Sequence, residues 1–183
     1  MKLVYPVGIL AALSLASCSK SSDGPSTATT ASAGSDPLAA SISGPRRNTP
    51  LAIVPGTVQP LLPKHGIYAH GGGTATTPWR TIVDLDAGTV TAATSSSVGG
   101  LPFDKMEHTS TRPLTDAERT VFTGLSERAW REPMPTLSHP TGDYGEVLAT
   151  TDGDDAFYLD GFGPMQPAAA AALVNKLKLI AGH

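Results

Sequence analysis

The stretch WRTIVDLDAGTVTAAT, residues 79–94, decides the fold class of this chain. Residues 79–85 set Trp, Thr, Val and Leu in alternation against Arg, Ile and Asp, and this period of two is typical of a strand. Residues 86–88, Asp-Ala-Gly, supply turn chemistry, and residues 89–94 continue as a second β-rich run. The stretch therefore predicts a β-hairpin.

A second hairpin is predicted nearer the C-terminus. Residues 145–150 and 156–162 flank the polar sequence Asp-Gly-Asp-Asp at 152–155. Together with Asp160, these acidic residues superficially resemble a calcium loop. An EF-hand needs acidic residues at alternating positions, a glycine at the sixth and a glutamate at the twelfth, and this order is not met. We therefore interpret residues 152–155 as a solvated hairpin turn.

Two amphipathic helices accompany the hairpins. Thr115 and Glu118 have the spacing of a capping box at the start of the first helix, and Pro133 ends it. Pro167 suits the first turn of the second helix, and Gly182 closes it. The apolar residues predicted to face the core are Val121, Phe122, Leu125 and Ala129 with Trp130 beside them, then Leu173, Val174, Leu177 and Ile180. The residues predicted on the solvated side of the first helix are Asp116, Glu118, Glu127 and Glu132.

These segments predict an α+β fold in which an antiparallel sheet, built from two hairpins, carries two helices packed on one face. We place this domain at residues 64–183. Residues 18–63 are rich in Ser, Thr, Ala, Gly and Pro, which is typical of a flexible tether. Its apolar islands, residues 51–54 and 58–62, either pack against the domain or form an extended proline-rich segment. Arg46-Arg47 is interpreted as solvated linker rather than as a contact to anionic lipid.

The N-terminus has the pattern of an export signal. A basic start is followed by an apolar run over residues 3–15, which is too short to span a bilayer as a helix. The next residues, Leu15-Ala16-Ser17-Cys18, resemble the bacterial lipobox, and Cys18 is the only cysteine. The alternatives are an ordinary secretory signal cut near Ser17 and a cysteine of the soluble core.

The lipobox resemblance implies that residues 1–17 are a cleaved signal peptide and that Cys18 carries the lipid. Bacterial lipoproteins bear a diacylglyceryl thioether, and usually an acyl chain such as palmitate on the new amino terminus. Ser19, rather than aspartate, follows the cysteine, which in a host with two membranes implies the outer membrane, facing the periplasm. The two-hairpin plan of the domain is similar to that of small bacterial lipoproteins without an assigned function.

Composition restricts the function classes. The net charge is −3 and there is no basic block, which argues against nucleic acid as a partner. With Cys18 lipidated, no thiol is left for a disulfide, a metal ligand or a nucleophile.

No catalytic, cofactor-binding or metal-ligating residue is assigned from the sequence. His65 and His70 are an odd number of positions apart, so on a strand they point to opposite faces. Residues 71–73 (Gly-Gly-Gly) and 95–97 (Ser-Ser-Ser) lack the context of a phosphate loop or a nucleophile elbow and are interpreted as loops. The aromatic residues are interpreted as core: Trp79, Tyr144, Phe157, Tyr158 and Phe162.

The sequence thus predicts a lipid-anchored envelope protein with a non-catalytic binding or structural domain, whose partners are the membrane and another envelope component. One alternative is a small periplasmic hydrolase or metal-dependent enzyme, and another is a small-ligand module built on the Gly-rich loops. The enzyme would need several polar residues to converge in one pocket. Those residues are His65, His70, His108, His139 and Asp154.

Overall fold

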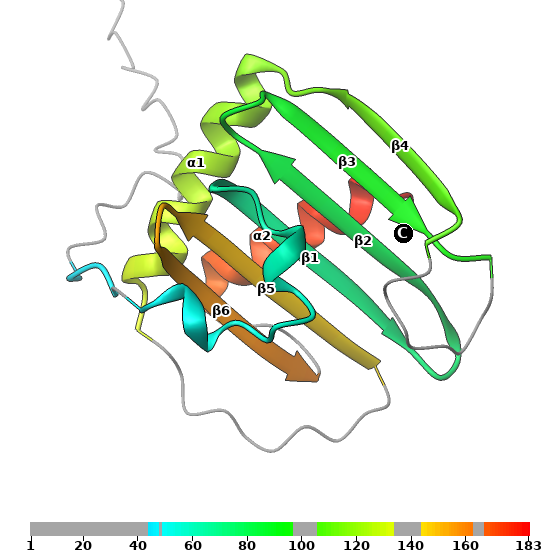
Figure 1. Cartoon of the computed structure of the whole chain (residues 1–183), viewed down its shortest axis with the longest axis horizontal. Coiled ribbons are helices and arrows are strands. Elements are labelled where there is room, and N and C mark those ends of the chain that lie inside the picture. Colours follow the sequence, from blue (N-terminus) through cyan, green and yellow to red (C-terminus); the bar gives the residue numbers. More distant parts are fainter. Residues whose placement is uncertain (1–43, 48, 97–105, 134–143, 163–166) are drawn as a thin grey trace, which may run out of the picture. The chain divides into compact units, whose positions relative to one another are not determined.

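The computed structural model describes residues 44–47, 49–96, 106–133, 144–162 and 167–183, all within the unit formed by residues 41–183. Its strands form one six-stranded antiparallel sheet in the order β4-β3-β2-β1-β5-β6 (Figure 1). The strands are β1 His65–Gly73, β2 Thr76–Asp84, β3 Thr89–Thr94, β4 His108–Pro113, β5 Tyr144–Asp152 and β6 Asp155–Phe162. The predicted α+β class is confirmed.

The sheet holds more than the two predicted hairpins. Those hairpins are β2–β3 and β5–β6, with positive-φ glycines, Gly88 and Gly153, in their turns. Strand β1 lies between them, and β4 is added at the outer edge of β3. The triplet at 71–73, interpreted as a loop, is instead the end of β1, where the register against β2 shifts. Because β1 is buried along almost its whole length, it shows no alternation of polar and apolar residues.

Helices α1 (Asp116–Arg131) and α2 (Ala168–Ile180) both lie behind the sheet in Figure 1, and we call this side the helix face. Thr115 and Glu118 form the predicted capping box. The Thr81 hydroxyl of β2 donates to the Leu177 carbonyl of α2 at 2.9 Å, which ties sheet to helix. None of the described helices is both long and apolar enough to cross a bilayer. The large side chains of this core include Trp79, Trp130, Ile67, Leu148, Phe122, Leu173 and Leu177.

Two predictions about α1 are wrong. Val121, expected in the core, is 40% exposed, because the helix meets the core through Phe122 and Leu125. Glu132, expected on the solvated side, is buried, and its Oε2 accepts a hydrogen bond from the Ala169 amide at 2.9 Å. Glu132 follows the last residue of α1, so it leaves the helical face and reaches the first turn of α2.

The opposite face of the sheet is covered by residues 49–62, which contain the 3₁₀ turns Leu51–Ile53 and Gln59–Leu61. In Figure 1 these turns (cyan) lie in front of β5 and β6. Val54 and Val58 are buried there in a second core, whose other members include Tyr68, Val147 and Ala149. Of the two alternatives for the apolar islands, packing against the domain is the one that the structure has.

Arg46 and Arg47 are not solvated linker, contrary to the sequence interpretation. The Arg46 guanidinium lies 4.3 Å from the ring centroid of Trp130 and pairs with Asp152 at 2.6 Å. Arg47 lies 5.2 Å from the ring of Phe157 and donates to the Ala129 carbonyl at 2.6 Å. Cation–π contacts of this kind fix the two side chains against α1 and β6, so the chain joins the folded unit at this corner.

Candidate functional site

The structure places the predicted histidines apart from one another. His65 and His70 both lie on β1 and, as predicted from their spacing, on opposite faces of the sheet. His108 lies on β4, at the far edge of the sheet from β5 and β6. His139 and Cys18 lie outside the described residues. The histidines that are described therefore do not converge as an enzyme site would require.

His65 contacts acidic residues of the two hairpin turns. Its Nδ1 lies 2.7 Å from Asp86 Oδ2 and its Nε2 lies 3.6 Å from Asp152 Oδ1, and its side chain is partly exposed. Asp154 and Asp155 belong to the predicted β5–β6 turn. Across the described ranges, no group of three or more His, Cys, Asp or Glu side chains has an arrangement that could hold a metal ion.

His70 is buried against Tyr68. Its Nδ1 lies 2.7 Å from the Tyr68 hydroxyl, and the two rings meet edge to face. Burial, and then the nearby Arg80 charge, lower the pKa of His70 to about 4, whereas burial raises the pKa of Tyr68 to about 12. Both groups are therefore neutral near pH 7. Since general acid–base catalysis needs a pKa near the working pH, this pair is suited to packing rather than to proton transfer.

The predicted aromatic core is largely observed. Trp79 and Phe157 are buried on the helix face, and Tyr158 is half-buried on the opposite face, where its hydroxyl donates to Asp160 at 3.3 Å. Burial and the neighbouring Asp160 carboxylate raise the pKa of Tyr158. The side chains of Tyr144 and Phe162 lie outside those described.

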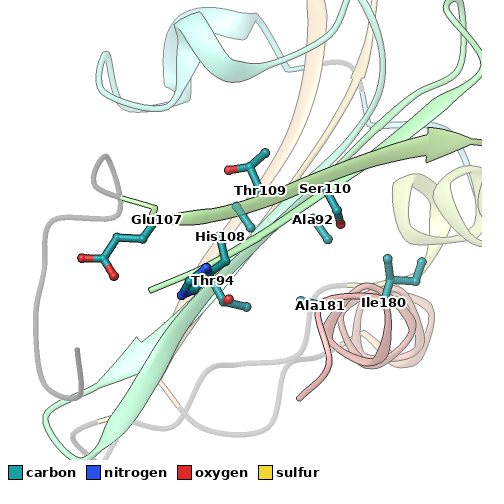
Figure 2. A pocket seen from close by; sticks show the side chains of 9 residues that line it. Ala92, Thr94, Glu107, His108, Thr109, Ser110, Ile180 and Ala181 are labelled. Atoms are coloured by element: carbon teal, nitrogen blue, oxygen red, sulfur yellow. The ribbon is translucent and has the colours of Figure 1, made fainter. Parts of the chain in front are cut away.

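A polar crevice of about 380 Å³ opens between the β3–β4 edge and the C-terminal end of α2 (Figure 2). Thr94 and His108 lie beside one another on the wall formed by the strands, and Ile180 and Ala181 form the wall opposite. The crevice exists because α2 ends before it covers β4. Its full lining is Ala92, Ala93, Thr94, Glu107, His108, Thr109, Ser110, Ile180 and Ala181.

Glu107 lies at one end of the crevice, and its carboxylate points away from α2 (Figure 2). Glu107 accepts hydrogen bonds from the Ser96 hydroxyl and from the Ser96 amide, the latter at 3.2 Å, and these bonds lower the pKa of Glu107. Its carboxylate is therefore ionised at neutral pH. The carbonyl end of α2, at Ile180 and Ala181, adds the negative pole of the helix dipole.

Strand β4 is exposed at all six of its residues. It pairs with β3 on one side and is the last strand at that edge of the described sheet. The sequence analysis missed β4, although its Thr-Ser-Thr run has strand propensity. Because all six residues are exposed, β4 does not show the alternation of buried and exposed residues that reveals a strand.

A second hollow, of about 320 Å³, lies between α1 and α2. It is mostly apolar, and Val121 and Leu179 are large apolar side chains exposed there, the latter 72% exposed. Glu118 and Lys176 lie at its rim.

Comparison of this chain with protein-family models, with curated proteins and with solved structures finds no match. The candidate site is therefore defined by geometry: an exposed edge strand, β4, with a polar crevice beside it. Such an arrangement holds hydrogen-bonding groups for a ligand.

Proposed function

We propose that this chain is a lipid-anchored protein of the cell envelope whose α+β domain binds another envelope component and is not itself an enzyme. The observation that carries the anchor is the position of Cys18, directly after an apolar run and two small residues. In a host with two membranes, Ser19 favours the outer membrane, with the domain in the periplasm.

The described fold supports a binding role by what it leaves exposed. The chain joins the folded unit at Arg46, beside Asp152 and the β5–β6 turn. The crevice lies at the other end of the strands and toward the other edge of the sheet, at Thr94 and His108. The crevice and β4 thus lie diagonally across the sheet from residues 44–47, where the described part of the chain begins.

The anchor is tested by the intact mass of the protein extracted from membranes, with Cys18→Ser as the comparison. We expect an acylated chain that begins at Cys18, and loss of both the acyl mass and membrane association in the variant. An unmodified, soluble wild-type chain would overturn the anchor and favour a freely secreted protein.

The binding role is tested by crosslinking in intact envelopes, followed by purification of the anchored protein. We expect one or a few envelope components to be recovered repeatedly with wild type. Mock-purified envelopes from cells lacking the protein are the control. Repeated recovery of nothing above this control would count against a binding domain.

A further inference from the structure

We propose that β4 binds an extended polypeptide segment of a partner protein as an additional antiparallel or parallel strand, and that a basic side chain of this segment enters the adjacent crevice. This inference rests on the proposed binding function and names its site and the class of its ligand. Addition of a strand to a sheet edge supplies affinity through main-chain hydrogen bonds and specificity through pockets for alternate side chains.

The register of β4 shows which backbone groups point outward. The Leu114 amide donates to the Gly88 carbonyl at 2.9 Å, so Gly88 and Leu114 form a hydrogen-bonded pair. Along an antiparallel ladder, hydrogen-bonded pairs alternate with non-hydrogen-bonded pairs. The pair Thr91–Thr111 is then a non-hydrogen-bonded one, which agrees with the close approach of its hydroxyls at 2.9 Å. The amide and carbonyl groups of Thr109 and Thr111 therefore point away from β3, toward the exposed edge.

The two edges of the described sheet, β6 and β4, differ in how far their backbone groups are covered. At β6, the Leu51 amide donates to the Asp154 carbonyl at 3.0 Å and the Ala156 amide donates to the Thr49 carbonyl at 2.8 Å, so that edge is covered near its start. Nothing comparable lies along β4 in the described residues. Proteins usually protect edge strands with charges, prolines or cover. In β4 such protection is confined to its end, at Arg112 and Pro113.

The crevice selects the side chain. It lies on the helix face beside β4, where alternate residues of an added strand would point. The carbonyl end of α2 favours a cation there, while Thr94 and Ser110 offer hydroxyl acceptors. Lysine or arginine in an extended segment meets all of these requirements. Charge complementarity thus favours a basic partner segment over a second copy of β4, because Arg112 of β4 is already ion-paired with Glu118.

The test uses the full-length anchored protein in detergent and a phage-displayed library of random 12-residue peptides. Selected peptides are synthesised, and their affinities are measured for wild type, Thr109→Pro and Thr109→Val. Proline removes only an outward amide, which β3 does not use, and valine keeps that amide while removing the hydroxyl. We expect peptides enriched in Lys and Arg, at least tenfold weaker binding to Thr109→Pro, and less than threefold change for Thr109→Val.

Two further measurements make the outcome decisive. Binding should slow hydrogen exchange of the wild-type Thr109 and Thr111 amides at least tenfold, a readout that holds even if Thr109→Pro fails to fold. Replacement of the basic residue of a selected peptide by methionine should weaken binding severalfold, with a smaller effect in high salt.

Equal binding to both Thr109 variants, unprotected amides, or selection of no peptide would overturn the proposal. A dimer of the chain that Thr109→Pro abolishes would overturn it in favour of a second copy. Recovery of the same envelope partner by both Thr109 variants would overturn only the strand-addition site, whereas recovery of no partner by wild type would overturn the binding function itself.

Discussion

Thr150 of β5 is fully buried on the helix face, and its hydroxyl has no hydrogen-bond partner among the described residues. A buried hydroxyl without a partner costs roughly 1–3 kcal/mol. We therefore expect Thr150→Val to raise the free energy of unfolding by about 1 kcal/mol, measured by urea denaturation. Thr81→Val is the matched control. Because Thr81 donates to Leu177, the same change there should lower the free energy of unfolding by about 1 kcal/mol. Effects of the same sign would contradict this reading of the core.

His70 gives a prediction about acid stability. Its pKa falls from an ordinary 6.5 to about 4 on folding, chiefly through burial. Between these values the unfolded chain binds a proton that the folded chain does not, so stability is full above pH 6.5 and falls as the pH drops toward 4. The free energy of unfolding should decrease by about 2 kcal/mol from this group between pH 7 and pH 4.5.

The measurement is urea denaturation of wild type, His70→Gln and His65→Gln at both pH values. The loss of stability should be about 2 kcal/mol smaller in His70→Gln than in wild type. His65 is the comparison site, because its ring contacts two carboxylates, and its replacement should not reduce the acid-induced loss as His70→Gln does. Equal losses in all three proteins would show that His70 is not buried as described.

At the scale of elements, α1 and α2 are joined by a cap that crosses between them. Helix α2 has no side-chain cap from its own N-terminal residue, Pro167, and Glu132 supplies the acceptor instead. Glu132 also pairs with Arg128 at 3.4 Å. We expect Glu132→Ala to lower the free energy of unfolding by about 1–2 kcal/mol, and Glu132→Gln by about half as much, since an amide oxygen can still accept from Ala169.

Glu127→Ala is the matched control for the Glu132 variants. Glu127 is also on α1, but it is largely exposed and its ion pairs are long, at 3.6 and 3.7 Å. Its loss should change the stability by less than about 0.5 kcal/mol. Thermal and urea denaturation of the variants compare the two sites, and equal effects would remove the special role of Glu132.

At the scale of the whole molecule, residues 49–62 form part of the fold. We expect a chain that begins at Gly44 to retain the stability of the longer protein. A chain that begins at Lys64 loses Val54 and Val58 from the second core, and its free energy of unfolding should fall by about 3 kcal/mol or more. Urea denaturation of both truncated chains makes the comparison. Equal stability would contradict the packing of this segment on the sheet.

The sequence predicted those elements whose residues divide between one buried and one exposed face. Hairpin β2–β3 shows this division, and so does most of α1. Strand β1 is buried on both faces and β4 on neither, so neither has a two-residue period to detect. Residues 49–62 looked like tether because proline and small residues dominate there, and only the sheet shows that Val54 and Val58 are buried.

The candidate site was beyond sequence reasoning for a different reason. Its walls come from β3, from β4 and from the end of α2, at Thr94, His108 and Ile180. None of these side chains carries a motif, and only the strand order brings them to one place. Glu107 accepts hydrogen bonds from Ser96, 11 residues earlier in the chain, and these lower its pKa. The sequence gives no sign of this pairing.

The covered start of β6 and the bare length of β4 have a consequence for stoichiometry. Edge-to-edge joining of sheets into a continuous array requires two usable edges on every subunit, as monomers in a linear polymer need two reactive ends. Residues 49–51 obstruct one of them, at Asp154 and Ala156. Copies of this chain at high concentration should therefore join through β4 as pairs at most, rather than as a continuous array, because each offers one open edge of the described sheet.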